Sequence, residues 1–370
     1  MPAQRVRRFL VAVLLFFSLA TTVVSQELAA PDAWVALQRG DASKAAAIFR
    51  DALDRSPRDA VLHYGSAQAS LALGRTDAAI SSLKRAIEYA PKFIQAMVLL
   101  AQVAYDAADL DLAVRSLEKA AAIAPQDPTI ASQLAQWRKE ASLHQSFQTQ
   151  PGVHFNVLFE GPHQKAVGQH VSAVLESAYW NIGKTLNIYP GAALDVILYS
   201  NQQFRDVTRA PAWASGGYDG RIRLPVGGAL RSPEALERVV VHEYIHSVVQ
   251  HAGGAGVPAW LSEGLASYFE PGDKSWAAKA LRAARTRIRL EELVEGFGGL
   301  DGATALIAYA QSQIGAQLLY ERVSPHAGSF LQLLGNGHTV DQALSRHGVQ
   351  PEAFYAEWRR RIGMPGDGTR

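Results

Sequence analysis

Two histidines and a glutamate have a spacing that suits a metal site. The segment from His242 to His246 has the residue order His-Glu-Tyr-Ile-His, an HExxH pattern, inside a helix predicted from Ser232 to Gln250. Residues four apart on a helix project from one face, so both imidazoles can bind one metal ion. Glu243 lies about 100° around the helix from His242, where it can reach a metal-bound water. Metal-assisted hydrolysis requires this arrangement.

A third ligand is expected from a second helix packed against the first. That helix is predicted from Pro258 to Glu270, and Glu263 lies in its first turns, seventeen residues after His246. Glycines within 253–256 allow the chain to reverse between the two helices. The chain has no cysteine, so the ligands of any metal must be His, Asp or Glu. Glu270 is expected to be a helix-end charge rather than a ligand.

The third-ligand segment carries a resemblance to a known family. Residues 260–264, Trp-Leu-Ser-Glu-Gly, match the segment of gluzincins in which a glutamate completes a His₂Glu site. A metzincin would have glycine and histidine where this chain has Val249 and Ala252, so that class is excluded. From about Val153 to Trp358 the chain resembles the bacterial peptidase MA-like domain, a zinc peptidase domain often joined to tetratricopeptide repeats. The matching segments are the opening strand, residues 218–222, the HExxH helix, residues 260–264 and residues 308–312.

This resemblance implies a zincin-like α+β fold, one Zn²⁺ per chain and hydrolysis of peptide bonds, but no particular substrate. His242, His246 and Glu263 would hold the zinc and leave a fourth position for water. Glu243 would act as the general base on that zinc-activated water and then pass the proton to the leaving amine. Tyr309, in a Tyr-x-x-Ser segment like that of the family, is the candidate donor to the oxyanion.

The same resemblance implies a substrate-binding strand at the edge of a sheet. The strand Gly217–Leu224 would pair with an extended substrate, and Gly216 and its neighbour would let the substrate backbone approach. The candidate substrate-binding residues are Gly217, Tyr218, Arg221 and Arg223. The two arginines would favour acidic residues or a C-terminal carboxylate, unless they are simply solvated. Ser312 is expected to support Tyr309, and His338 is a weaker candidate for the oxyanion donor.

The elements that must position these residues predict an α+β domain over 148–362. Strands alternate with helices at first, and helices then continue toward the C-terminus. The predicted strands are 153–159, 194–199 and 216–224, and Asp219-Gly220 within the last of these is a hairpin or turn signal. The predicted helices are 165–186, 203–208, 232–250, 258–270, 302–323, 325–334, 339–346 and 351–362. Residues 148–152 are expected to join this domain to the preceding one, and 363–370 to form a disordered tail.

The part of the chain before this domain has an internal repeat. Pro57, Pro91 and Pro125 lie 34 residues apart, and alanines, large apolar residues and turn residues keep the same register. This order resembles tetratricopeptide repeats. We expect about three repeats and a closing helix over 26–147, forming an all-α solenoid. Such repeats bind a protein partner or a substrate, or brace a neighbouring domain, and the residues do not identify the partner.

Residues 1–25 have the pattern of a secretory signal peptide. Arg5, Arg7 and Arg8 precede an apolar run from Phe9 to Val24, and cleavage is predicted after Ser25. The alternative is an uncleaved anchor. After cleavage no stable membrane span is expected, and the product would be exported to a bacterial periplasm or the exterior.

Composition limits the remaining functions. The 370 residues are 48% hydrophobic and 19% charged, as in a chain that buries a core. The formal net charge is +2, and residues 1–25 contribute three arginines and no acid, so the rest of the chain has 2 − 3 = −1. Nucleic acid is therefore not an expected partner. The absence of cysteine excludes disulfides, a cysteine nucleophile and iron–sulfur chemistry.

Two other functions fit the same residues. In one, the protein is a non-catalytic adaptor whose repeats bind a partner while the zincin-like domain is a scaffold. The intact ligand set and Glu243 argue against it, because a scaffold requires neither. In the other, the protein is a zinc amidase acting on cell-wall peptides. Endopeptidase and exopeptidase action both stay open, although the lack of a Gly-Ala-Met-Glu-Asn motif favours the former.

Overall fold

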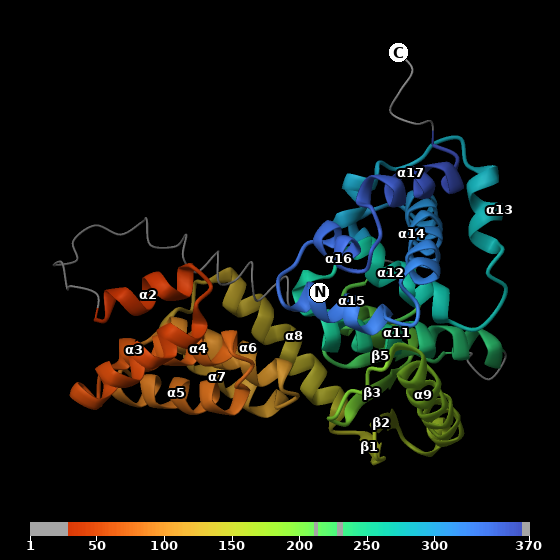
Figure 1. Ribbon diagram of the computed structural model, residues 1–370. Helices are drawn as coiled ribbons and strands as arrows, with labels where there is room; N and C mark the ends of the chain where they lie inside the picture. The colour runs from red at the N-terminus through yellow and green to blue at the C-terminus, as the bar shows by residue number, and fades with distance from the viewer. Residues whose placement is uncertain (1–28, 211–213, 228–231, 365–370) are drawn as a thin grey trace. The chain divides into compact units, whose positions relative to one another are not determined.

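A computed structural model describes residues 29–210, 214–227 and 232–364. This part of the chain divides into two compact units, of which the first ends at Gln145 and the second begins at Ser146 (Figure 1).

Two sequence-based predictions fall on other residues. The predicted signal peptide over 1–25 lies outside the described residues, as do residues 365–370 of the predicted tail. Among the helices in the described ranges, none is both long enough and apolar enough to span a membrane.

The first unit is a stack of helix pairs, coloured red to yellow in Figure 1. Its helices are α2 (Pro31–Gln38), α3 (Ala42–Arg55), α4 (Ala60–Ala72), α5 (Thr76–Tyr89), α6 (Ile94–Asp106), α7 (Leu110–Ile123) and α8 (Pro128–His144). The starts of α3, α5 and α7 are 34 residues apart, and so are the starts of α4, α6 and α8. The predicted repeat length is therefore the repeat length of the fold. The repeating alanines and large apolar residues are buried: Ala45, Ala79, Ala113, Phe49, Leu83 and Leu117.

The turn inside each helix pair uses a left-handed backbone conformation. It occurs at Gly40, Gly74 and Ala108, with φ of +81°, +70° and +64°. After each of these residues, the next backbone amide donates a hydrogen bond to a carbonyl five residues back. Glycine adopts this conformation freely, whereas a residue with a Cβ loses about 1–2 kcal/mol in it. The third repeat therefore carries a strain that the first two avoid.

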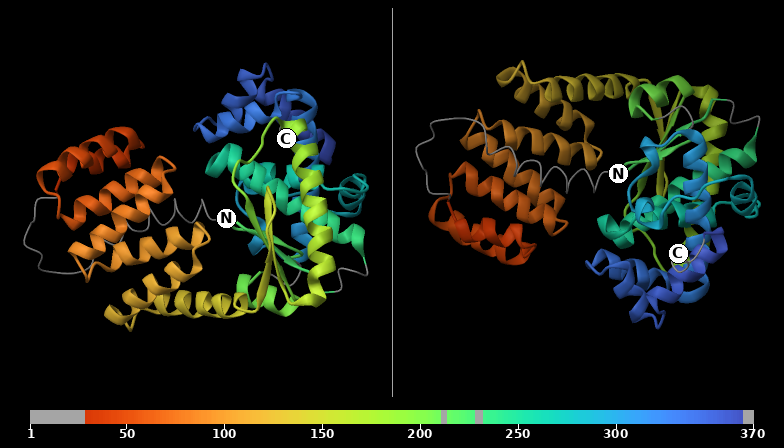
Figure 2. Two further views of the ribbon diagram at one scale, coloured as in Figure 1. Left: turned by 90° about the horizontal axis from the view of Figure 1, so that it is seen from below. Right: turned by 90° about the horizontal axis from the view of Figure 1, so that it is seen from above.

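The second unit contains a five-stranded mixed sheet of order β1-β2-β3-β5-β4 (Figure 2). The strands are β1 (Phe147–Gln150), β2 (Phe155–Glu160), β3 (Leu194–Tyr199), β4 (Gly217–Tyr218) and β5 (Ile222–Pro225). The three inner strands are parallel, whereas β1 and β4 are antiparallel edge strands. The sheet and the helices around it form the α+β mixture that the sequence predicts.

Two strand predictions need correction. The expected joint at 148–152 contains most of β1, and Val153, expected to face the core, is 82% exposed. The segment 216–224 forms a hairpin with Gly220 at φ of +103°, as the Asp219-Gly220 signal indicates, so the expected single edge strand Gly217–Leu224 is divided. Of the two hairpin strands, only β4 lies at an edge of the sheet.

Helices cover the sheet and build most of the second unit. They are α9 (Lys165–Leu186), α10 (Asn201–Thr208), α11 (Pro233–Gly253), α12 (Ala259–Phe269), α13 (Trp276–Ala283), α14 (Gly302–Val323), α15 (Ala327–Gly335), α16 (Val340–Arg346) and α17 (Pro351–Ile362). Of these, α13 was not predicted. Helix α9 packs against β2, while α11 packs against β4, β5 and α9. Together they enclose one hydrophobic core.

Helices α12 and α14 pack closely against each other. A Cβ added at Gly264 would lie 2.2 Å from the carbonyl oxygen of Ser312 and 2.8 Å from the Cβ of Ala316. Gly264 thus lets the backbone of α14 rest directly on α12. The crossing places Tyr309, one turn before Ser312, over the helix that carries Glu263.

The strained turn of the third repeat gives a stability prediction. Ala108→Gly should raise the free energy of unfolding by about 0.5–1 kcal/mol, because relief of the left-handed penalty exceeds the entropy that glycine adds to the unfolded chain. Gly74→Ala should lower it by a similar amount, and its new Cβ would have no heavy atom within 4 Å in the described structure. Urea unfolding of the full chain, followed by helix content, measures both. An equal loss of unfolding free energy in the two variants would contradict the inference that Ala108 is strained.

Candidate metal centre

The face of α11 that carries two histidines is set by the helix itself. Pro233 stands in its first turn, where a missing amide costs nothing. The apolar side chains of α11 are buried in the core, among them Val240, Ile245 and Val248. His242 and His246, four residues apart, therefore share the side that turns toward α12, and their ring centroids are 5.0 Å apart.

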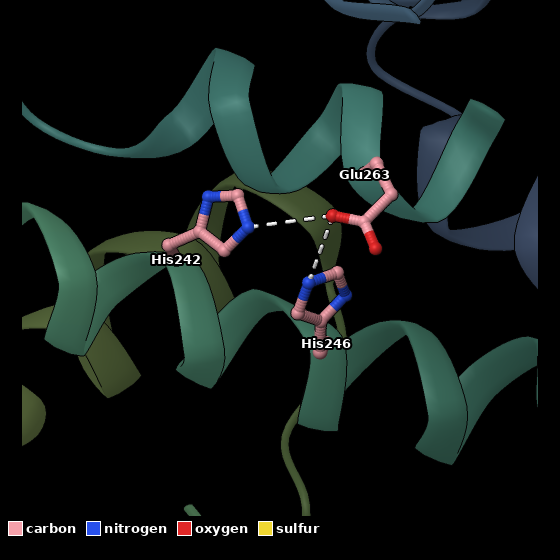
Figure 3. A group of neighbouring side chains, drawn as sticks. All are labelled: His242, His246 and Glu263. Carbon is pink, nitrogen blue, oxygen red and sulfur yellow. Dashed lines mark ion pairs between the residues drawn. The ribbon is translucent and has the colours of Figure 1, made fainter. Parts of the chain in front are cut away.

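Helix α12 brings a carboxylate to these two rings (Figure 3). Oε2 of Glu263 is 3.5 Å from Nε2 of His242 and 3.4 Å from Nε2 of His246. One ligand atom from each of the three residues lies within 4.8 Å of the others. Their side chains are 15–20% exposed, so the cluster is recessed but open to solvent. The structure brings together the three residues that the sequence proposed as ligands.

The donor set fits a zinc ion. Oε2 of Glu263 is buried and has no hydrogen-bond partner among the described residues, although it faces two imidazoles. Ligand atoms of tetrahedral Zn²⁺, at bond lengths of about 2.0–2.2 Å, lie roughly 3.4 Å from one another. The two nitrogen–oxygen distances have this length and are too long for good hydrogen bonds. Two imidazole nitrogens with one carboxylate oxygen is also a ligand set that zinc takes in hydrolases.

The other nitrogen of each ring has a partner of its own. Nδ1 of His242 lies 3.0 Å from Oε2 of Glu270, and Nδ1 of His246 lies 2.9 Å from Oγ of Ser262. Such contacts fix the ring orientation and leave Nε2 free to bind a metal. Sequence reasoning gave Glu270 a helix-end role and gave Ser262 none. The available signal was their spacing from Glu263: Ser262 precedes it by one residue on α12, and Glu270, seven residues after it, caps the end of that helix.

The charges at this centre shift the pKa values of its members. Burial lowers the pKa of His242, but the carboxylates of Glu263, Glu270 and Glu243 beside it outweigh that effect and raise it to about 10. Burial raises the pKa of Glu263, but the charges of His246 and His242 outweigh it, so the carboxyl has a pKa well below its usual range. Both shifts have the same cause: a carboxylate favours the protonated imidazole, and the imidazole favours the ionised carboxylate, where little water screens the two charges.

Glu243, the candidate base, points to a drier place than the ligands. Its side chain is 6% exposed. Burial raises its pKa, and the nearby His246 and His242 only partly oppose that rise. A carboxylate with little solvation is a stronger proton acceptor than one in water.

Tyr309, the candidate oxyanion donor, lies beside the cluster. Its ring centroid is 6.3 Å from that of His242 and 5.4 Å from that of Phe297, which it meets edge to face. Burial raises the pKa of its hydroxyl, and the charges of Glu263 and Glu243 raise it further. The hydroxyl is therefore a proton donor at neutral pH.

Ser312 and His338 lie at the expected places in the chain, but their contacts differ from the expected supporting roles. The Oγ of Ser312 is buried without a hydrogen-bond partner in the described residues, so it gives Tyr309 no visible support. His338 follows α15, where its Nδ1 lies 3.1 Å from the carbonyl oxygen of Leu333. It lines a depression of about 570 Å³ whose other lining residues belong to 336–346, and no member of the metal cluster is among them.

The substrate-strand prediction is changed by the hairpin. Gly217 and Tyr218 form the edge strand β4, which packs against α11. Arg221 and Arg223 instead belong to the turn and the inner strand β5, and both are buried. Nε of Arg223 donates to Asp219 at 3.0 Å and its Nη1 to the hydroxyl of Tyr199 at 2.8 Å. Because both residues are buried, they are not placed to contact a substrate directly.

Comparisons with known proteins bear on the first unit. The family model for tetratricopeptide repeats matches residues 36–83 and 70–136. The predicted repeats are thereby confirmed, and the first unit is a tetratricopeptide-repeat array. The match covers less than a third of the chain and does not extend into the second unit.

Two other comparisons add little. A search of curated proteins found no match. One solved structure, of the UNC-45 chaperone and described for its features critical for binding and folding muscle myosin, is similar with a TM-score of 0.30 and 11% identity. The alignment covers 91% of this chain and 32% of that one. This chain thus spans about a third of that structure, and so low a score carries no argument about function.

Zinc binding tests the centre. The full chain should bind one Zn²⁺, and Glu263→Ala or His246→Ala should abolish tight binding. Glu270→Ala, which frees Nδ1 of His242, should weaken the affinity by about 10–100-fold. Competition with a chromophoric chelator measures these affinities. Glu352→Ala, at an exposed position in the first turn of α17, is the control. Unchanged binding in Glu263→Ala would exclude this centre.

Proposed function

We propose that this protein is an exported zinc-dependent metallopeptidase with a zincin-like second unit. The observation that carries the proposal is the convergence of Nε2 of His242, Nε2 of His246 and Oε2 of Glu263, with Glu243 next to them on α11. A cluster with a structural role alone would not need a buried carboxylate beside the ligands.

His242, His246 and Glu263 would hold the metal through those three atoms. Bound Zn²⁺ supplies Lewis-acid polarisation of a carbonyl group and of water. Glu270 and Ser262 keep the rings turned so that Nε2 faces the centre. Because both helices are anchored in the core, the ligand set is held in place before any metal binds.

The remaining steps belong to residues of the chain. Glu243 would accept a proton from the attacking water and deliver it to the leaving amine, which is the work of a general base that becomes a general acid. The hydroxyl of Tyr309 would donate a hydrogen bond to the oxygen that gains charge as the carbonyl is attacked. The edge strand β4, with Gly217 and Tyr218, would pair with an extended substrate through its backbone.

The repeats would recruit a substrate or a partner protein. Tetratricopeptide repeats form extended surfaces suited to protein partners, and the first unit is built of them.

The proposal of export depends only on residues 1–25, whose arginines and apolar run have the pattern of a signal peptide. It would place the protein in a bacterial periplasm or outside the cell.

The second candidate function is that of a non-catalytic adaptor. The specific observation in its favour is the family match, which lies wholly in the repeats. In that case the second unit would bind metal for stability, and Glu243 would have no chemical role. The third, a zinc amidase for cell-wall peptides, uses the same residues as the peptidase and differs only in substrate.

Replacement of Glu243 separates these functions. We expect the chain lacking residues 1–25, loaded with Zn²⁺, to cleave a mixed peptide library. Glu243→Gln keeps the size of the side chain but removes the base, so it should bind zinc normally and lose about 10²–10⁴-fold in rate. Mass spectrometry of the products gives the rates and the cleavage sites.

Glu234→Gln is the matched control, since Glu234 is exposed in the first turn of the same helix. It should leave the rate unchanged. If neither parent nor Glu243→Gln cleaves the library while both bind zinc, the adaptor function gains support. Cleavage confined to added cell-wall peptides would identify the amidase.

A further inference from the structure

The backbone of Gly216 lies against the side chain of Glu243. A Cβ built on Gly216 would be 2.6 Å from Oε1 and 3.0 Å from Cγ of Glu243, and 2.9 Å from Cγ1 of Val239. Val239 and Glu243 are four residues apart on α11, so they form one ridge of that helix. The residue just before β4 therefore rests on the ridge that carries the candidate base.

Space, rather than backbone conformation, requires a glycine here. Gly216 is not among the glycines with positive φ. Its neighbour Gly217 gives a direct contrast, since a Cβ there would have no heavy atom within 4 Å in the described structure. Of two adjacent glycines, only the first lacks room for a side chain.

We propose that Gly216 is a positioning residue for Glu243. Its backbone closes one side of the pocket that holds the carboxylate, and so restricts the rotamers of that side chain. The carboxylate is near enough to His242, His246 and Glu263 for their charges to interact with it. A displaced carboxylate would therefore change its position relative to the ligand cluster. This differs from the expected role of Gly216, which was to admit the substrate backbone.

A stability cycle on the full chain tests the contact without any substrate. Gly216→Ala should lower the Tm of the second unit by about 3–8 °C, because it overpacks a filled site. In a Glu243→Ala background part of that loss should vanish, since one of the two side chains that block the new methyl group is gone while Val239 stays. In a Glu243→Gln background the loss should persist, because glutamine has the size of glutamate. Differential scanning calorimetry measures all the variants.

Gly217→Ala is the control for stability, and it should change the Tm by less than a third of the Gly216→Ala effect. An equal loss of Tm in the Glu243→Ala and parent backgrounds would overturn the proposal, as would an equal loss in Gly217→Ala. If Gly216→Ala alone does not fold, recovery of the fold in Gly216→Ala/Glu243→Ala supports the contact. Failure of both to fold contradicts it.

The catalytic meaning of this contact rests on the proposed peptidase function. Once a peptide that the parent cleaves is known, it serves as the substrate for the variant. Gly216→Ala should lower kcat by about 10²-fold while KM and zinc affinity stay within about threefold, because only the base is displaced. An unchanged kcat would overturn the positioning role even if the stability cycle succeeds. If no peptide is cleaved by the parent, the proposed function fails, while the calorimetric cycle still decides whether Gly216 sets the position of Glu243.

Discussion

The second unit is organised around an excess of acidic groups beside two imidazoles. Glu243, Glu263 and Glu270 come from α11 and α12 and meet His242 and His246 where little water is present. Uncompensated negative charge is costly in such a place, and the cost falls when a cation sits among the carboxylates. A protonated imidazole offsets part of this cost, and a divalent metal ion would offset more of it. The positions of the neighbouring elements follow from keeping these five side chains together.

Two close approaches without side chains set that geometry. At Gly264 the backbone of α14 rests on α12, which brings Tyr309 to the carboxylate of Glu263. At Gly216 the chain leading into β4 rests on α11 beside Glu243. The centre is thereby enclosed by a helix on one side and by the sheet edge on another. Side chains at either glycine would separate the elements, and the groups that face the ligands would separate with them.

The ligands were predictable because their pattern is local. A four-residue spacing on one helix fixes the relation of His242 to His246 whatever the rest of the chain does, and the helix ends near Glu263 are marked by proline and glycine. The repeat length was predictable because it is written directly in the sequence, as prolines 34 residues apart with other residues in the same register. The contacts of Glu270 and Ser262 depend on how two helices cross, which no spacing reveals. Arg221 and Arg223 were misplaced because alternation cannot distinguish an edge strand from an inner one after a tight turn.

The ligands and their orienting partners also occupy a short stretch of the chain. From His242 to Glu270 there are two helices and one turn, so the contacts among the candidate ligands, Ser262 and Glu270 all lie within this stretch. Contacts of this kind form early in folding, since little chain entropy is lost in closing the loop. The sheet, by contrast, must bring β2, β3 and β5 together across intervening helices. If zinc binds as proposed, a helical hairpin of this composition would capture the ion before the sheet is complete, and the captured ion would then favour the helix crossing on which the rest of the unit assembles.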